Sequence, residues 1–301
     1  MTEPRTALPA EPVTDLATAP GPGTGTGPGP LTGTGTPGPG RAPRVALVAG
    51  AARGIGAATV AVLAAAGWRV MAVDRCADDP DLPYPLGSRA ELEKVAADAG
   101  PGVAIAEADT RDVDALAAAV AETERTWGGL DAAFAVAGVI AGGVPAWDVP
   151  AGQEQAVLDI DLGGVLNLAR VAVPALLRRP EPRHGRFLAV ASAAATQGLP
   201  LLAAYCAAKA GVTGFIRALA VELRGTGITA NAVSPGSTAT PILDESARLY
   251  GLPSAESFAL QQPIGRLLEA AEVAAVLAFL AGDGASGMTG AIVPVDGGLG
   301  L

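Results

Sequence analysis

Residues 45–56 read VALVAGAARGIG, and this stretch decides the fold. Five small apolar residues predict a buried strand, glycines at 50, 54 and 56 predict a tight turn, and the alanine-rich run up to Ala66 predicts a helix. Such a turn lets a diphosphate approach the backbone closely, and the helix N-terminus offers free N–H groups and the positive end of its dipole. The stretch therefore predicts a dinucleotide site that includes Gly50, Arg53, Gly54, Ile55 and Gly56.

The same alternation of strand and helix continues to the end of the chain. We expect further strands at 69–73, 103–106, 132–136, 187–191, 228–233 and 291–295, and further helices at 88–99, 112–127, 152–177, 203–223 and 270–281. Strands that are apolar throughout and alternate with helices indicate a parallel sheet covered on both faces. With right-handed crossovers this is a doubly wound, Rossmann-type α/β fold, forming a single domain over residues 44–301.

Residues 1–43 differ sharply in composition. Between positions 20 and 40 nearly every residue is Gly, Pro or Thr. Such a segment cannot bury enough apolar surface to offset its ordering entropy, so we expect a disordered tail. A polyproline II segment that binds a partner is the alternative.

Composition excludes several classes of function. The 301 residues carry a net charge of −10, which argues against nucleic acid and anionic membranes as partners. The two cysteines cannot form a disulfide framework and favour a reducing compartment, so we expect a cytoplasmic protein. We identify no signal peptide and no apolar run approaching the ~18–20 residues of a membrane span. The one histidine, His184, lies in a basic loop at 178–186 without metal-ligand partners, so we expect it to be solvated and predict no metal site.

Asp74 ends the second predicted strand, where a carboxylate accepts hydrogen bonds from both ribose hydroxyls of NAD and repels a 2′-phosphate. Arg53, and Arg75 directly after Asp74, are positioned to meet a phosphate. These two arginines therefore favour NADP over NAD. We predict NAD as the cofactor, and an NADPH-dependent ketone reductase remains the alternative.

Tyr205 and Lys209 lie four residues apart in a predicted helix, so their side chains share one face. Ser192 lies just past a predicted buried strand, where the carboxyl edge of the sheet opens. A phenol with a pKa of about 10 is a poor base at neutral pH, but a nearby ammonium favours the phenolate. These residues predict a base for an alcohol proton, a group that tunes it, and a hydroxyl that holds the substrate oxygen.

The glycine turn and the Ser192, Tyr205 and Lys209 set resemble the short-chain dehydrogenase/reductase family, whose motifs run from Gly50 to Gly298. The resemblance implies hydride transfer between an alcohol and NAD, with Lys209 also holding the nicotinamide ribose and Tyr205 lying beside the ring. It also implies a homo-oligomer, a dimer or tetramer, formed through the helices at 152–177 and 203–223. It adds further cofactor contacts at Asp109, Thr110, Ala137, Gly138, Pro235, Gly236, Thr238 and Thr240.

Asp161 occupies the position at which this family often has an asparagine that helps to relay a proton away from the lysine. A carboxylate there is able to hold the relay water, and it raises the pKa of the lysine. The alternative is that Asp161 only caps a kinked helix.

Two insertions interrupt the pattern. Residues 75–87 are longer than an ordinary strand-to-helix connection and carry three prolines. This loop resembles the mycofactocin-associated branch of the family, which implies an NAD that stays bound and is recycled in place by the redox cofactor mycofactocin; a surface loop without function is the alternative. Residues 241–263 follow the nicotinamide turn, and we expect them to roof a pocket for an apolar alcohol or ketone.

The sequence thus predicts an NAD-dependent dehydrogenase of a small apolar secondary alcohol. Besides the NADPH-dependent reductase, a dinucleotide-sensing scaffold without catalysis is the alternative of a different class, because a fold does not determine a function.

Overall fold

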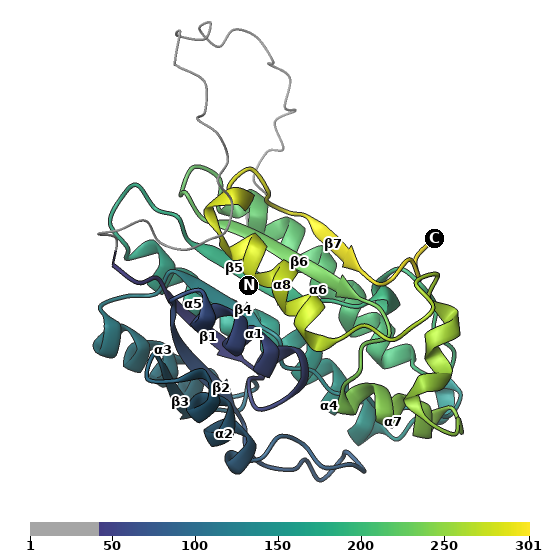
Figure 1. Cartoon of the computed structure of the whole chain (residues 1–301). Coiled ribbons are helices and arrows are strands. Elements are labelled where there is room, and N and C mark those ends of the chain that lie inside the picture. Colours follow the sequence, from purple (N-terminus) through teal and green to yellow (C-terminus); the bar gives the residue numbers. More distant parts are fainter. Residues whose placement is uncertain (1–41) are drawn as a thin grey trace, which may run out of the picture. The chain divides into compact units, whose positions relative to one another are not determined.

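The computed structural model describes residues 42–301 (Figure 1). The predicted disordered tail lies, except for its last two residues, outside the described residues. Within the described range seven strands form one sheet: β1 Val45–Ala49, β2 Arg69–Asp74, β3 Val103–Glu107, β4 Ala132–Ala135, β5 Arg186–Val190, β6 Thr229–Pro235 and β7 Ile292–Val295.

All neighbouring strands pair in parallel, in the order β3-β2-β1-β4-β5-β6-β7. The strand order reverses at β1: β2 and β3 are added on one side of it, and β4 to β7 are added on the other side. The doubly wound prediction is therefore confirmed. The carboxyl ends on the two sides of such a reversal leave a crevice in which ligands bind.

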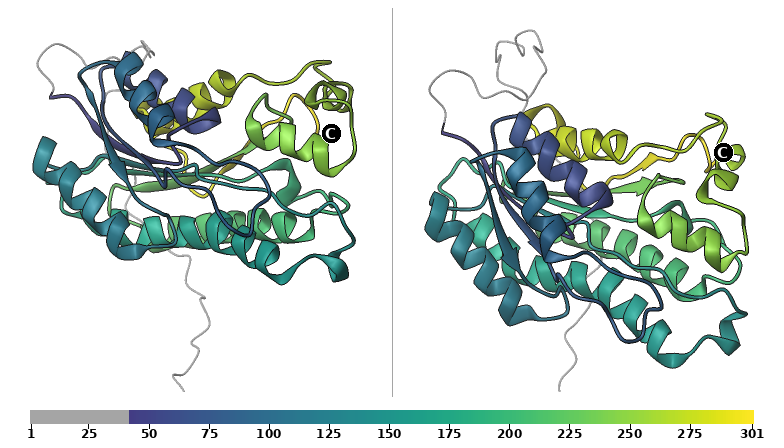
Figure 2. Two further views of the ribbon diagram at one scale, coloured as in Figure 1. Left: turned by 90° about the horizontal axis from the view of Figure 1, so that it is seen from below. Right: turned by 60° about the horizontal axis from the view of Figure 1, so that its bottom comes forward.

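Helices cover both faces of the sheet (Figure 2). One face buries apolar residues of α1 Gly54–Ala65, α2 Arg89–Ala99 and α8 Ala270–Ala281, and the other buries those of α3 Val113–Trp127, α5 Gly164–Leu177 and α6 Ala203–Glu222. Helix α2 begins with a capping box, since the Ser88 side chain accepts from the Glu91 N–H and the Glu91 carboxylate accepts from the Ser88 N–H.

The long helix predicted at 152–177 is present, but one of its turns is π-helical. The chain forms α4 Ala151–Leu158, then a π-helical turn at Asp159–Gly163, and then α5. A π turn holds one more residue than an α turn and is common at functional sites. Here it contains Asp161, whose side chain is fully buried.

The second insertion contains helical segments that the sequence analysis did not predict. Residues 241–263 form α7 Pro241–Leu249 and a 3₁₀ helix at Ala255–Gln261. Pro241 stands at the first helical position, where its missing N–H costs nothing, and this signal marks the start of α7.

Residues Ala151–Leu177 and Ala203–Glu222 are long and apolar enough to cross a membrane by length and composition alone. The expectation that no segment reaches this threshold was therefore wrong. Half of the most apolar window of the first segment is buried against the rest of the protein. Helices that cover a buried parallel sheet meet the same criterion, so composition does not distinguish the two cases.

Candidate active site

A cavity of about 530 Å³ opens above the carboxyl ends of the strands. It is lined by every cofactor-binding residue predicted from the sequence, and by three of the four predicted catalytic residues: Gly50, Arg53, Gly54, Ile55, Gly56, Asp74, Arg75, Asp109, Thr110, Ala137, Gly138, Ser192, Tyr205, Lys209, Pro235, Gly236, Thr238 and Thr240. Asp161 does not line the cavity and lies behind Lys209.

The glycine turn between β1 and α1 leaves no room for side chains. Gly50 has a φ of +88°, and a Cβ at this position would collide with the backbone of Ala137. A Cβ at Gly56 would collide with the carbonyl oxygen of Gly50. Helix α1 has no side-chain cap at its N-terminus, so its first N–H groups stay available to an anion. The turn therefore fits a diphosphate, as the sequence predicts.

Asp74 lies at the end of β2 on the cavity wall, where its Oδ2 accepts a hydrogen bond of 2.9 Å from the Ala52 N–H. The two arginines able to favour a 2′-phosphate are both engaged elsewhere. Arg53 donates to the Pro85 carbonyl at 2.8 Å, and Arg75 pairs with Asp79 at 2.6 Å. The site therefore presents a carboxylate to the ribose and keeps both neighbouring guanidinium groups occupied.

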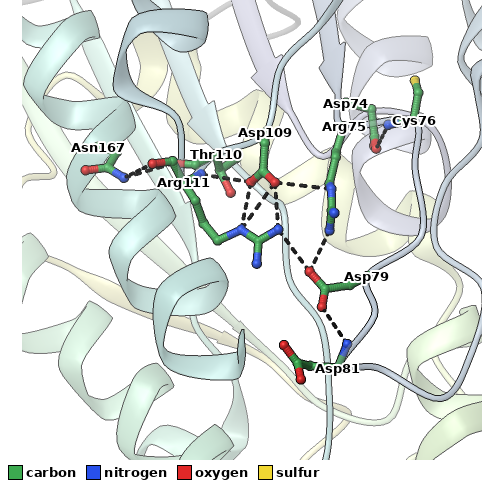
Figure 3. A network of polar contacts seen from close by, with 9 residues as sticks. All are labelled: Asp74, Arg75, Cys76, Asp79, Asp81, Asp109, Thr110, Arg111 and Asn167. Carbon is green, nitrogen blue, oxygen red and sulfur yellow. Dashed lines mark hydrogen bonds and ion pairs between the residues drawn. The ribbon is translucent and has the colours of Figure 1, made fainter. Parts of the chain in front are cut away.

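Asp79, a residue of the first insertion, is the centre of a network of charged side chains (Figure 3). Its carboxylate, only 1% exposed, lies 2.6 Å from Arg75 and 2.9 Å from Arg111. Asp109 pairs with the same two arginines, at 3.1 and 2.7 Å. Four charges from the 75–87 loop and the turn after β3 thus join beside the predicted adenosine end of the cavity.

Burial alone would raise the pKa of the Asp79 carboxyl. The N–H of Asp81 and the guanidinium groups of Arg75 and Arg111 outweigh that effect and hold this pKa below its usual value. These contacts therefore favour the charged form of Asp79. Asp79 was not predicted as a site residue, because nothing in the sequence distinguishes it from its acidic neighbours Asp78 and Asp81.

The far end of the 75–87 loop is attached to the opposite wall of the cavity. The Tyr84 hydroxyl accepts a hydrogen bond of 2.8 Å from the Ile140 N–H. Leu82 is buried, and it packs with Tyr84 and Leu86 against the segment after β4 and the π turn. The loop is consequently fixed at both ends, by ion pairs at one and by apolar packing at the other.

Ser192, Tyr205 and Lys209 lie together above β5. Ser192 follows the strand, and its hydroxyl is within hydrogen-bonding reach of the Tyr205 phenol. Lys209, one turn after Tyr205 in α6, has its Nζ 5.6 Å from the centre of the Tyr205 ring and donates to the Val190 carbonyl at 3.2 Å. The helical spacing places Tyr205 and Lys209 on one face of α6, and the end of β5 places Ser192 beside them. The three groups thus lie on one wall of the cavity, as predicted.

The electrostatics differ in one respect from the sequence expectation. Burial raises the pKa of the Tyr205 phenol, and the Asp161 carboxylate adds to this, while Lys209 and the Ser192 hydrogen bond only partly oppose it. Burial likewise opposes the charge of Lys209, but Asp161 and Tyr205 outweigh it, and the pKa of the ammonium is raised. The ammonium therefore does not by itself make the phenol acidic.

Asp161 is fixed from two sides. Its Oδ1 accepts a hydrogen bond of 2.7 Å from the Val139 N–H, and its Oδ2 lies 3.4 Å from Lys209 Nζ. Burial raises the pKa of this carboxyl against the opposing effect of Lys209. Asp161 thus contacts the cavity wall through Lys209 and the backbone of Val139.

The turn after β6 is held by a residue that the sequence analysis did not identify. The buried Gln262 side chain accepts from the Ser237 N–H at 2.9 Å and donates to the Ser237 carbonyl at 3.1 Å. Within the turn, the Thr240 hydroxyl donates to the Thr238 carbonyl at 3.1 Å. Gln262 comes from the second insertion, whose contact with this turn depends on the tertiary fold, so no local pattern reveals it.

The remaining wall of the cavity is mostly apolar. It comes from α7, the 3₁₀ helix and the segment after Ser192, and includes Leu199, Leu202, Ile242, Leu243, Leu252 and Phe258. Tyr250 packs edge-on against Phe258 and donates from its hydroxyl to the Pro200 carbonyl at 2.7 Å. The cations that line the cavity are Arg53, Arg75 and Lys209, and none of them belongs to this wall.

Comparisons with known proteins agree with this site. A family model described as enoyl-(acyl carrier protein) reductase matches residues 50–300. The chain is 35% identical to (−)-trans-carveol dehydrogenase of Rhodococcus erythropolis over 85% of this chain and 96% of that protein. It is 37% identical to cis-4-hydroxycyclohexanecarboxylate dehydrogenase of Sinomonas cyclohexanicum, with the same two coverages.

Among solved structures, carveol dehydrogenase from Mycobacterium avium in complex with NAD superposes with a TM-score of 0.80 at 32% identity, covering 85% of this chain and 97% of that one. The residues matched by the family model run from the glycine turn at Gly50 through Ser192, Tyr205 and Lys209 to residue 300. The chain belongs to the short-chain dehydrogenase/reductase family.

Proposed function

We propose that this protein is an NAD-dependent oxidoreductase that interconverts an apolar secondary alcohol and its ketone. The observation that carries the proposal is the placing of Ser192, Tyr205 and Lys209 on the wall of a cavity that also contains the glycine turn and Asp74. An apolar wall faces them and suits an uncharged substrate.

NAD, when bound, supplies a hydride acceptor and a positive charge. The glycine turn and the start of α1 hold its diphosphate, and Asp74 accepts from its ribose hydroxyls. Tyr205 Oη accepts the hydroxyl proton of the alcohol, and Ser192 Oγ donates to the substrate oxygen as its charge develops. The Lys209 ammonium stabilises the phenolate, and Asp161 keeps that ammonium charged and in place.

The identity of the cofactor follows from the same contacts. Arg53 and Arg75 are engaged with Pro85, Asp79 and Asp109, so neither is free to pair with a 2′-phosphate. We therefore favour NAD over the alternative of an NADPH-dependent reductase. Titration with NAD and NADP separates the two: comparable affinity for NADP would support the alternative.

We further propose that NAD stays bound through many turnovers and is reoxidised in place by mycofactocin. The support is the 75–87 loop, which is attached by ion pairs at one end and by Tyr84 at the other, beside the predicted adenosine end of the cavity. A loop fixed in this way slows the exit of a ligand beneath it.

We also propose a homo-oligomer, a dimer or tetramer, that forms through α5 and α6 and works in the cytoplasm. Leu177 and Val221, at the ends of these helices, are 37% and 64% exposed. Cys76 and Cys206 are free thiols, which suits a reducing compartment. Sedimentation equilibrium on the purified protein measures the oligomeric state directly, and a monomer would contradict the first part of this proposal.

The central experiment is to purify the protein, denature it, and identify any released nucleotide by mass. Stoichiometric NAD that survives dialysis supports the held cofactor, whereas an empty protein that binds NAD and releases it rapidly contradicts it. Turnover of a cyclic alcohol that is lost in Tyr205→Phe rules out the non-catalytic scaffold.

A further inference from the structure

A second cavity, of about 730 Å³, lies at the opposite edge of the sheet from the active site. Arg186 and Thr229, the first residues of β5 and β6, form part of it. The end of α6 and the loop before β7 complete the lining. The active site lies at the carboxyl ends of the same two strands, so the two cavities are separated by the length of the sheet.

The lining of this cavity is strongly basic, although the whole chain carries a net charge of −10. It includes the guanidinium groups of Arg183, Arg186, Arg217 and Arg224, together with His184. None of the lining residues, all within the described part of the chain, is acidic. The basic loop that the sequence analysis noted at 178–186 is thus one wall of a larger cationic surface.

The exposed arginines of α6 and its end are available to a ligand. The guanidinium groups of Arg217 and Arg224 make no hydrogen bond or ion pair with any other described residue. Arg183 is partly neutralised by Glu181 at 2.7 Å. Asp283 acts on Arg186 in the same sense, so the surrounding carboxylates compensate part of the positive charge, and the guanidinium groups of Arg217 and Arg224 remain unpaired within the described part of the chain.

Arg186 gives an independent indication of a ligand. Its side chain is 1% exposed, and its Nη1 and Nη2 donate to the carbonyls of Gly185 and Gly282 at 2.9 and 3.4 Å. Its Nε has no partner among the described residues, and neither does the buried Thr229 hydroxyl. Buried donors are rarely left unsatisfied, so these two unpartnered donors show that hydrogen bonding is incomplete at the strand ends that form part of the cavity wall.

We propose that this cavity binds a small phosphorylated anion. Guanidinium groups match the oxygen geometry of phosphate, and a phosphoryl group offers enough acceptors for several arginines and a hydroxyl at once. Ser286 and Thr289 add further hydroxyls to the lining, while Val221, Leu223 and Ile228 provide an apolar wall for the organic part of such a ligand.

Inorganic diphosphate is a suitable probe, and isothermal titration at constant ionic strength is the measurement. The protein is first saturated with NAD, because the glycine turn of the active site also fits a diphosphate. We expect one bound diphosphate per chain that does not displace NAD. We also expect the Arg217→Gln/Arg224→Gln double variant, which changes two exposed side chains, to bind at least roughly tenfold more weakly.

Two further variants separate this site from general electrostatic attraction. Arg170→Gln removes an exposed charge from α5 and leaves diphosphate binding unchanged. Thr229→Val removes the unpartnered hydroxyl at nearly constant volume and weakens binding. Absence of diphosphate binding, equal binding by the double variant, or tighter binding of citrate than of diphosphate would overturn the proposal. The readout is binding, so it is independent of whether the enzyme turns over any alcohol.

Discussion

Asp161 Oδ2 lies 3.4 Å from Lys209 Nζ, and both side chains are almost completely buried. A charge pair shielded from water interacts more strongly than one at the surface, and its partners adjust each other's protonation. Asp161 raises the pKa of Lys209 and, through space, that of Tyr205. We therefore expect the carboxylate at this position to influence the pH range in which the enzyme works.

Asp161→Asn removes a negative charge from this pair at almost constant volume. The pKa of Tyr205 falls, because the carboxylate no longer opposes the phenolate. The pKa of Lys209 also falls, because the carboxylate no longer offsets the effect of burial on the ammonium. We expect the whole pH profile of kcat/KM for alcohol oxidation to move to lower pH. The control is Asp159→Asn in the same π turn, whose carboxylate accepts from Gln155 and leaves the profile unchanged. An unshifted profile in Asp161→Asn would remove this residue from the mechanism.

Tyr205→Phe removes the group that accepts the proton and leaves the cavity wall in place. General acid–base catalysis typically contributes 10²–10⁴-fold, so we expect kcat to fall by roughly 10³-fold or more. NAD affinity, measured by fluorescence titration, changes little. Retention of most of the wild-type rate would show that another group takes the proton.

Asp79→Asn weakens the network that holds the 75–87 loop. The two arginines lose a buried counter-charge, and we expect the dissociation rate of bound NAD to rise by at least about tenfold. Dilution of NAD-loaded protein into excess labelled NAD measures this rate. Asp98→Asn, which breaks an exposed pair with Lys94, is the matched control. An unchanged rate of NAD exchange in Asp79→Asn would show that the apolar packing at the other end of the loop is enough to hold it in place.

Acid should release the same loop in the wild-type protein. The pKa of Asp79 is held below its usual value, so its contribution is complete above the unfolded-state value of about 3.9 and is lost as the pH falls through the folded-state pKa. We expect NAD exchange to be independent of pH between about 6 and 8 and to accelerate below about 4. The same exchange assay, run across this range, tests the prediction, and acceleration already at pH 6 would contradict it.

The substrate wall predicts a preference by charge. Its residues offer no cation to a carboxylate, so a neutral ring alcohol such as cyclohexanol should exceed 4-hydroxycyclohexanecarboxylate in kcat/KM by at least about 100-fold. One relative is named for that carboxylate, which makes the comparison informative. Equal efficiency with both substrates would show that a cation reaches the pocket in the working enzyme.

Much of the fold was predictable because its signals are local. The predominantly apolar strands and the glycine turn predicted the parallel sheet, and the four-residue spacing of Tyr205 and Lys209 placed both on one helix face. Most residues predicted to contact the nucleotide lie at or soon after the end of a strand, and they line one cavity because parallel strands end at the same edge of the sheet.

Other features depend on contacts between distant segments. Gln262 contacts the turn at Ser237, Asp79 pairs with Arg111, and Tyr84 reaches Ile140, and no periodicity in the sequence indicates any of these. The direction of the pKa shift of the Tyr205 phenol could also not be predicted from the sequence, because it is a balance between burial, Lys209 and Asp161. The sequence identified the charges but not how deeply they are buried.

The π turn at Asp159–Gly163 accommodates one residue more than an α turn between α4 and α5. Deleting one residue there would turn the segment into regular α-helix and keep the apolar stripe of α5 on the sheet, but it would change which side chain of the turn faces Lys209. Natural variants and designed libraries should accordingly tolerate such a deletion for folding while losing the contact between Asp161 and Lys209.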